Sequence, residues 1–380
     1  MKKTIIKYIK KYKENRIKLQ IEKLIADETF EDVNNQLPKQ VKKVAIITSY
    51  VGAHAGGMTS ILRIGTALSK ENFDVTYIAL GGQSEEEVQR NAKINLDDYR
   101  GKMTTKKALS KQYDVVIATD WKSVYTATKL NGYKMYFVQD YEPYFCEDGE
   151  RYILAKKTYE LGLHMVSLGK WNKREIERNV NVETKIDYID FPYEKSEYHM
   201  VERDYLSYKN KKEIKLVVYL KQAGRRLPTV IPIILKKVKE KMEKNGMSLN
   251  ISFYGGIEGI DASLGKNLGK LSKSELMDLY KDADFGMVSS MTNISLVPFE
   301  MLATGLPLIE FADGTFPYFF EKESAILTSF SADDLYKKIK ECLANPERLE
   351  YMNNNAIECM NNLSWENTGK QFAQILKTLV

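Results

Sequence analysis

The chain has 380 residues, of which 43% are apolar and 28% charged, and its formal net charge is +6. A single hydrophobic core serves at most about 250–300 residues, so this length predicts two domains. No stretch approaches the ~20 consecutive apolar residues of a membrane span, and three scattered cysteines form neither a disulfide framework nor a zinc spacing. Together with the absence of a signal-peptide pattern, these features predict a cytoplasmic protein.

The N-terminal part of the chain carries most of the excess positive charge. Residues 1–40 are predicted to form a basic helical extension, in which Ile5, Ile9 and Tyr12 recur at helical spacing among lysines. A basic amphipathic helix at residues 1–24 suits peripheral binding to an anionic membrane, here the inner face of the plasma membrane. The alternative is a solvated helix packed on the first domain.

Short apolar runs alternate with amphipathic segments from residue 43 onward. Strands are predicted at 43–48, 74–80, 114–120, 134–140, 164–169 and 185–190, and a helix from about Met58. This alternation is typical of a parallel sheet covered by helices on both faces. We therefore expect residues 41–205 to form a Rossmann-like domain, and a C-terminal helix at 364–380, capped by Ser364, to cross back to it.

A polar stretch at residues 193–213 interrupts the alternation and is predicted to be a linker. Strands resume at 214–220, 249–255, 284–290, 306–311 and 325–330, and helices follow at 332–343 and 346–362. Residues 206–363 are thus predicted to form a second Rossmann-like domain. Two such domains facing each other form a cleft lined by the carboxyl ends of both sheets, where open α/β sheets bind ligands.

The first predicted strand ends in the sequence SYVGAHAGGMTSILRIG. Gly56 and Gly57 precede a helix, so backbone amides there could meet an anionic group or a sugar, with His54 nearby. The spacing is not the GxGxxG fingerprint, which argues against a dehydrogenase. The alternative is a tight strand-to-helix loop that needs glycine for its backbone angles.

Acidic and aromatic side chains follow the strand in KMYFVQDYEPYF. Asp140 or Glu142 could accept a hydrogen bond or a proton from an acceptor hydroxyl, or Asp140 could cap a turn before Pro143. Tyr141 and Tyr144 could stack on sugar faces or pack within the domain.

The second domain opens with VVYLKQAGRRLPTVI, in which Lys221, Arg225 and Arg226 follow a strand. Fixed cations at this place suit a diphosphate, because they stabilise the negative charge that develops when it leaves a sugar. Further on, residues 293–296 are predicted to start a helix with Glu300 one turn in. Free amides at such a helix start can hold phosphate oxygens, and a carboxylate can bind a ribose hydroxyl.

The segments GKLSKSELMDLYKDADFGMVSS and LVPFEMLATGLPLI resemble the retaining family 4 glycosyltransferases of the GT-B fold, and the resemblance covers the chain from residue 43 to its end. Ala283 and Asp284 match an Ala-Asp pair of that family. Glu300 matches the second of two glutamates that are separated by seven residues, ahead of a Gly-Leu-Pro at 305–307. Thr292 stands where the family has the first glutamate, which normally helps to hold the donor sugar.

The family's Arg and Lys after the first strand of the second domain fall on Lys221 and Arg226. The sequence KMYFVQDYEPYF is similar to a motif of bacterial rhamnosyltransferases that assemble surface-layer glycans and rhamnose-rich wall polysaccharides, with Gln139 where many relatives have histidine. The resemblance implies retaining transfer of a sugar, L-rhamnose from dTDP-L-rhamnose, onto a saccharide or lipid-linked saccharide. A UDP-hexose donor and a non-catalytic binding subunit are the alternatives.

The resemblance implies no cofactor and no metal, and the sequence shows no nucleic-acid module. The residues assigned to the donor are Gly57, Lys221, Arg225, Arg226, Gly255, Gly256, Leu271, Thr292, Asn293, Ile294, Ser295, Leu296 and Glu300; those assigned to the acceptor are His54, Gly56, Gln139, Tyr141 and Tyr144; catalytic roles are assigned to Asp140, Glu142, Lys221 and Arg226.

Overall fold

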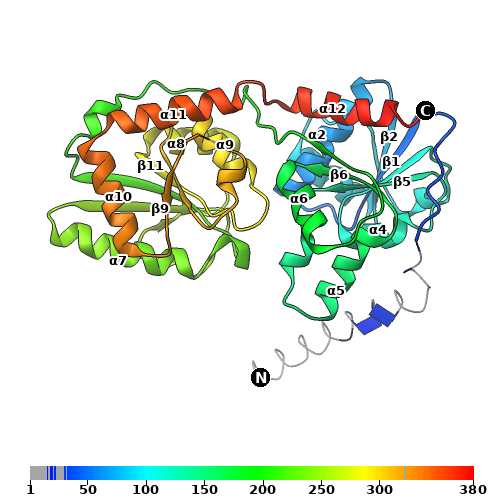
Figure 1. The fold of residues 1–380 in the computed structure, drawn as a ribbon, viewed down its shortest axis with the longest axis horizontal. Coiled ribbons are helices and arrows are strands. Elements are labelled where there is room, and N and C mark those ends of the chain that lie inside the picture. Colours follow the sequence, from blue (N-terminus) through cyan, green and yellow to red (C-terminus); the bar gives the residue numbers. More distant parts are fainter. Residues whose placement is uncertain (1–14, 16–17, 20, 23–29, 31, 321) are drawn as a thin grey trace. The chain divides into compact units, whose positions relative to one another are not determined.

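The computed structural model describes residues 15, 18–19, 21–22, 30, 32–320 and 322–380 (Figure 1). The predicted basic helix at 1–24 falls largely outside these residues. Clustering of contacts divides the chain into two compact units. Unit 1 runs to Ser167 and includes Lys173–Asp187 and Phe372–Val380, whereas unit 2 comprises Leu168–Asn172 and Tyr188–Gln371.

Unit 1 is built on a seven-stranded sheet in the order β3-β2-β1-β4-β5-β6-β7. Its strands are β1 (Lys43–Thr48), β2 (Asp74–Ala79), β3 (Lys102–Thr105), β4 (Val115–Ala118), β5 (Tyr133–Val138), β6 (His164–Leu168) and β7 (Ile186–Ile189). The chain starts in the middle, at β1, which pairs in parallel with both β2 and β4. The direction of winding reverses between β1 and β4, which is where sheets of this kind bind ligands.

Helices cover both faces of this sheet. They are α2 (Gly56–Lys70), α3 (Glu85–Asn95), α4 (Trp121–Ala127), α5 (Glu150–Lys157) and α6 (Lys170–Asn179), with short 3-10 turns η1 (Lys106–Ser110), η2 (Glu142–Phe145) and η3 (Thr158–Glu160). Because parallel crossovers are right-handed, α2 and α3 lie on one face and α4, α5 and α6 on the other. This double cover explains why the central strand β1 is buried from Val44 to Thr48.

Unit 2 contains a six-stranded parallel sheet in the order β10-β9-β8-β11-β12-β13. Its strands are β8 (Glu213–Tyr219), β9 (Ser248–Tyr254), β10 (Lys266–Asn267), β11 (Phe285–Met287), β12 (Leu308–Phe311) and β13 (Ile326–Thr328). Its helices are α7 (Val230–Lys244), α8 (Lys273–Asp282), α9 (Leu296–Ala303), α10 (Ala332–Ala344) and α11 (Glu347–Met360), with turns η4 (Tyr205–Tyr208), η5 (Gly224–Arg226) and η6 (Phe316–Tyr318).

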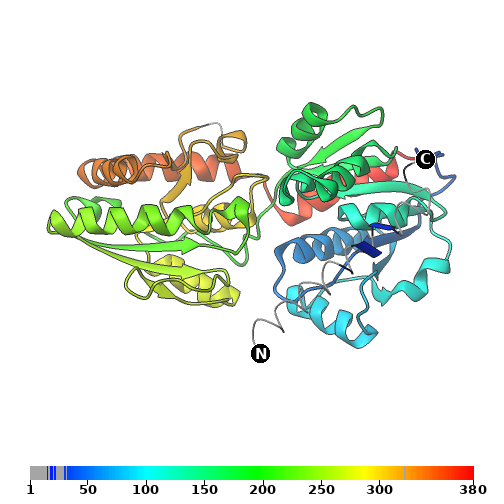
Figure 2. The same ribbon diagram turned by 90° about the horizontal axis from the view of Figure 1, so that it is seen from below.

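The core of unit 2 follows from side-chain periodicity. Strand β8 alternates buried Ile214 and Leu216 with exposed Lys215, as expected for period 2. In α7, Ile231, Ile234, Leu235, Val238 and Met242 recur at helical spacing and are buried. Figure 2 shows α7 as the long green helix running along this sheet.

The prediction of an α/β chain with two Rossmann-like sheets is confirmed. Each predicted apolar run forms a strand, and Ser364 caps α12 (Trp365–Lys377) by accepting from the amide of Asn367 at 3.1 Å. Two strands were missed, β3 and β10. Both lie at sheet edges, and their sequences, KMTT and KN, carry little apolar signal.

Residues 193–213 were predicted to be a linker; Glu213 begins β8, and the preceding segment 193–212 packs on unit 2. Its tyrosines Tyr193, Tyr198, Tyr205 and Tyr208 are all buried. The change from unit 1 to unit 2 falls at 187/188, upstream of the 205/206 boundary that the polar composition suggested. The tyrosines hold this segment on unit 2 by burying their rings and donating through their hydroxyls, Tyr205 to Gly305 O at 2.7 Å and Tyr208 to Asp284 O at 3.1 Å.

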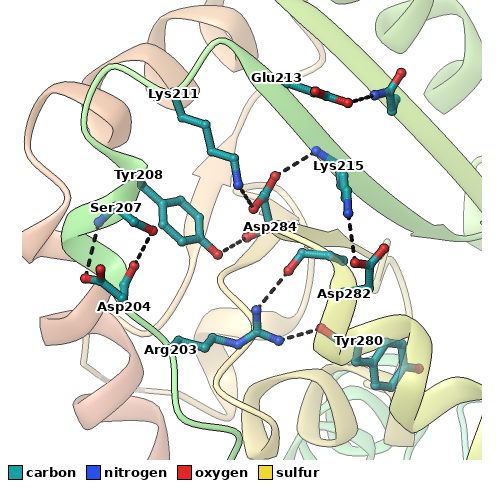
Figure 3. A network of polar contacts seen from close by, with 12 residues as sticks. Arg203, Asp204, Ser207, Tyr208, Lys211, Glu213, Lys215, Tyr280, Asp282 and Asp284 are labelled. Carbon is teal, nitrogen blue, oxygen red and sulfur yellow. Dashed lines mark hydrogen bonds and ion pairs between the residues drawn. The ribbon is translucent and has the colours of Figure 1, made fainter.

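A polar network fastens the same segment to unit 2 (Figure 3). Arg203 donates to the carbonyls of Tyr280, Ala283 at 2.8 Å and Thr304 at 3.2 Å, which lie at the C-terminal ends of α8 and α9. Asp284 is buried and accepts from Lys211 Nζ at 2.6 Å and the amide of Lys215 at 2.9 Å. The network therefore ties residues about 70–100 positions apart in sequence, which no local pattern reveals.

The last residues of α12 belong to unit 1. The ring of Phe372 packs edge-on against Phe137 at 5.7 Å between centroids, and Lys377 Nζ pairs with Glu71 at 2.6 Å. Within the described part of the chain, none of the helices has both the length and the apolar character needed to cross a bilayer.

Candidate functional site

The loops that follow β1, β4 and β5 meet at the carboxyl edge of the sheet in unit 1, because these strands are neighbours. Asp120, directly after β4, accepts from the amide and the hydroxyl of Ser49, at 2.8 and 2.5 Å. The same carboxylate caps α4 through the amides of Lys122 and Ser123. Asp120 thus fixes one loop to the next, and the sequence analysis did not identify it.

Three side-chain amides hold the loop between β1 and α2. Gln83 makes two bonds with the backbone of Val51, at 2.9 and 3.0 Å, and Asn91 donates to the same carbonyl. Asn95 accepts from the amide of Ala55 and donates to Gly52 O, both at 2.7 Å. These residues were also missed, although Asn91 and Asn95 lie one helical turn apart on α3, a spacing that places them on one face.

This anchored loop presents the predicted residues His54, Gly56 and Gly57, all exposed. His54 has a left-handed backbone, with φ of 52°, and the two glycines begin α2. A Cβ on Gly57 would lie 3.5 Å from the side-chain oxygen of Gln139, so the structure brings these two predicted residues together. The amides at the start of α2 therefore lie beside the carboxamide that follows β5.

Glu142 follows β5, at the start of η2, and its carboxylate is bonded to residues of β5 and α4. Its Oε2 accepts from the hydroxyl of Tyr136 at 2.7 Å and the amide of Trp121 at 2.5 Å. Burial, together with the negative charges of Asp120 and Asp140, raises the pKa of Glu142 to about 8. A carboxyl that changes protonation near neutral pH has the property that a proton acceptor in catalysis requires.

The neighbouring predicted residues differ in how far they are exposed. Asp140 accepts from the amide of Tyr141 at 2.9 Å, as a turn cap does. Tyr141 is completely buried and contacts the rings of Tyr144 and Tyr159. Its ring therefore packs within the domain and does not offer a face to a sugar. Tyr144 is 41% exposed, and its hydroxyl donates to Glu175 at 2.5 Å, which fixes the ring.

We expect Glu142 to make the stability of the protein dependent on pH. Because its folded pKa is raised, its contribution is fully present below the unfolded pKa near 4.5 and is lost as pH rises through about 8. Glu142→Gln keeps an acceptor for Trp121 and Tyr136 but does not titrate. Between pH 5 and 9, the free energy of unfolding of the wild type should therefore fall by on the order of 4 kcal/mol more than that of Glu142→Gln. Urea-induced unfolding at a series of pH values measures this, with exposed Glu147→Gln as the control. If the unfolding free energy depends on pH equally in the wild type and in Glu142→Gln, the prediction is contradicted.

In unit 2, the predicted cations lie in and before η5, directly after β8. Arg226 is only 8% exposed and donates to Ser289 O at 2.6 Å, which ties η5 to the end of β11. Lys221 is half-buried, with Nζ 5.6 Å from the centre of the Tyr219 ring, and Arg225 is also half-buried. The turn after β8 thus holds its cationic side chains at the carboxyl edge of the sheet, where β8 and β11 are neighbours.

Gly255 and Gly256 end β9 at the same edge, and both have positive φ, 111° and 85°. A Cβ on Gly255 would approach Leu220 O to 2.7 Å, so glycine lets β9 pass close to the start of the cationic turn. A Cβ on Gly256 would meet the Lys270 side chain at 3.3 Å, next to the predicted Leu271.

The N-terminus of α9 lies in the same unit, after β11, and Ser295 is its N-cap without a side-chain capping bond. The hydroxyls of Ser289 and Ser295 are buried and have no hydrogen-bond partner among the described residues. The first amides of a helix lack partners within the helix, so an anion there would satisfy both kinds of donor. Thr292, Asn293 and Ile294 are buried, and Thr292 O accepts from Thr315 Oγ1 at 2.5 Å.

Glu300 lies one turn into α9, as predicted, and is half-buried. Its negative charge acts on Tyr254 and Tyr280, whose hydroxyls are 2.6 Å apart. Burial is the main cause that raises the pKa of both tyrosines, and Glu300 adds to it. The structure therefore places Glu300 near the end of β9, in the unit that holds the cationic turn.

Two surface hollows lie elsewhere. One of about 420 Å³ is lined by Lys215, Asn250 and Gly265 among others, and one of about 650 Å³ by Asn34, Tyr113 and Lys134 among others. Neither contains a predicted site residue, and their lining does not include the carboxyl-edge loops described above. Among the residues that the structure describes, no group of three His, Cys, Asp or Glu side chains is arranged to hold a metal ion.

Comparison with known proteins adds a family match to this geometry. Residues 233–374 match the model of a family described as Glycosyl transferase-like. The chain is 24% identical over 283 residues to the O-antigen biosynthesis protein RfbC of Myxococcus xanthus. That match covers 68% of this chain and 20% of the relative, so the chain spans a fifth of its length.

Solved structures share the fold over most of the chain. Sucrose-phosphate synthase (tll1590) from Thermosynechococcus elongatus superposes with a TM-score of 0.66 and 15% identity, covering 89% of this chain and 99% of that one. Anabaena Alr3699/HepE, solved with UDP and glucose, gives 0.66 and 11% identity, with coverages of 89% and 100%. At these identities the similarity shows a common fold.

Proposed function

We propose that this chain, which has the GT-B fold of the glycosyltransferases, transfers a sugar from a nucleoside diphosphate donor to a saccharide during assembly of a bacterial surface polysaccharide. The observation that carries the proposal is the arrangement in unit 2. Arg226 is fixed on Ser289, and the amides and unsatisfied hydroxyls that begin α9 follow within a few residues. These groups suit a diphosphate.

On the donor side, the chemistry is charge stabilisation. Lys221, Arg225 and Arg226 offset the negative charge that grows on the leaving diphosphate, and preorganised cations do this without the reorientation that water needs. Glu300 binds ribose hydroxyls, and Gly255 and Gly256 let the backbone approach the nucleotide. The reaction as proposed requires no metal and no cofactor.

On the acceptor side, the residues of unit 1 position a hydroxyl and manage its proton. Asp140 and Glu142 are the candidate proton acceptors, and the raised pKa of Glu142 supports its assignment. His54, Gly56 and Gln139 form the surface against which the acceptor lies, with the exposed ring of Tyr144. Retention of anomeric configuration is part of the proposal and is supported by the family resemblance.

For the donor, we propose dTDP-L-rhamnose, supported by the similarity of the motif at 134–145 to bacterial rhamnosyltransferases. A UDP-hexose is the second candidate, which the UDP and glucose bound to the Anabaena structure favour. A lipid-linked acceptor, met at the membrane through residues 1–24, belongs to the same proposal and is supported by the basic spacing of that segment.

A donor panel tests this function. Purified protein is incubated with dTDP-rhamnose, UDP-glucose and UDP-N-acetylglucosamine and with rhamnose-containing acceptors, and product anomers are read by NMR. We expect one donor to be consumed, and Lys221→Met to raise its KM about tenfold because one charge-assisted contact is lost. Exposed Lys237→Met on α7 is the control. Nucleotide binding without transfer would favour the non-catalytic subunit, and absence of both would refute the proposal.

A further inference from the structure

Strand β12 carries a carboxyl that the donor assignment does not use. Glu310 lies within the otherwise apolar run LPLIEF and is 0% exposed. An ionised carboxylate in such a place costs several kcal/mol unless it is paired and hydrogen-bonded, so a buried glutamate needs a specific setting.

The setting of Glu310 is the segment to which Arg226 is bound. Glu310 accepts from the hydroxyl of Ser290 at 2.7 Å and from the amide of Ser290 at 3.2 Å. Arg226 donates to the carbonyl of the preceding residue, Ser289, at 2.6 Å. The buried carboxyl of Glu310 and the buried guanidinium of Arg226 thus bind two consecutive residues that follow β11. The positive charge of Arg226 also acts on Glu310.

The two strands that flank β12 bring no charge to Glu310. The flanking strands supply Phe285–Met287 and Ile326–Thr328, which contain no titratable side chain. Thr315, after β12, donates through its amide and its hydroxyl to Ser290 O, at 2.6 and 3.0 Å. Arg226 is a charged group that acts on Glu310, so the charge balance of this pair depends on the protonation state of Glu310.

We propose that Glu310 is a positioning residue that controls how much of the positive charge of Arg226 is available to the donor diphosphate. This inference rests on the proposed function. When Glu310 is protonated, the guanidinium is uncompensated and attracts the diphosphate. When Glu310 is ionised, its negative charge partly offsets that of the guanidinium, and the diphosphate is bound more weakly.

The protonation state of Glu310 is expected to change within a pH range in which binding can be measured. Burial raises the pKa of Glu310 to about 8, whereas the bonds from Ser290 and the charge of Arg226 act in the opposite direction. Glu310 is therefore mostly protonated near pH 7 and ionises above pH 8. By linkage, an anion that favours protonated Glu310 must also raise its proton affinity, so binding near pH 8 takes up protons.

Calorimetric titration with UDP and with dTDP between pH 6.5 and 9.5 tests the inference. For the wild type we expect Kd to rise about tenfold across pH 8, with proton uptake detected by comparing buffers of different ionisation heat. Glu310→Gln keeps the size of the side chain. When both Kd curves are corrected for ionisation of the ligand, the Kd of Glu310→Gln should change less than twofold from its value at pH 6.5, and the proton uptake should vanish. Parallel curves for the two proteins would overturn the proposal.

Ser290→Ala gives a second readout, which also covers the case that Glu310→Gln does not fold. Loss of the serine hydroxyl removes one bond that favours ionised Glu310, so the pH at which Kd rises should move upward. An unchanged midpoint in a folded Ser290→Ala protein contradicts the inference. If neither nucleotide binds the wild type at any pH, the proposed function fails and the inference with it, whereas binding with no Glu310 dependence removes the inference alone.

Discussion

Replacement of Glu300 by Gln should lower kcat/KM for the donor about 100-fold. The carboxylate lies one turn into α9, close to the end of β9, where the ribose of a bound nucleotide is expected. Hydrogen bonds to a charged group contribute about 1.5–3 kcal/mol each, and two of them to neighbouring hydroxyls weaken together when the charge is removed. A loss near 3 kcal/mol corresponds to roughly 100-fold.

Steady-state kinetics with the donor found in the panel provides the measurement. Glu347→Gln, an exposed residue at the start of α11, is the matched control and should behave as the wild type. A fall in kcat/KM that arises only from KM indicates lost donor binding, and one that includes kcat indicates interactions made in the transition state. Wild-type kinetics in Glu300→Gln would remove this residue from the donor site.

Replacement of Arg203 by Ala should destabilise the protein by about 3 kcal/mol. Its guanidinium satisfies three carbonyls at the ends of α8 and α9 and fastens the segment 193–212. The favourable interaction of a cation with helix C-termini is lost at the same time. Arg203→Lys should recover less than half of the loss, because an ammonium group cannot form the same planar fork.

Urea-induced unfolding followed by circular dichroism measures the change, with Glu202→Ala as an exposed neighbouring control. If Arg203→Ala unfolds at the same urea concentration as the wild type, the segment is held by its buried tyrosines and the three carbonyl bonds add little. Because α9 also carries Glu300, loosening of its C-terminal end should raise the KM for the donor in parallel with the loss of stability.

Local patterns were sufficient to predict the elements and where part of the proposed donor site lies in them. Apolar runs such as 43–48 and 214–220 form the central strands β1 and β8, and the helix that bears Glu300 begins at Leu296, within the predicted range 293–296. The cationic turn after β8 could also be predicted, because the strand and the charged residues that follow it are neighbours in the sequence. These features are decided by residues within a few positions of one another.

Tertiary structure decided the polar partnerships. Ser49 and Asp120 lie 71 positions apart, and Arg203 and Thr304 lie 101 apart, yet they are bonded in the folded chain. In the sequence, Asp120, Arg203 and Glu310 look like ordinary charged residues, because burial and pKa depend on which distant segments surround a group. Composition and periodicity therefore determined the two sheets and the basic turn of this protein, whereas only the fold decided which charged residues are buried, paired and able to act on a ligand.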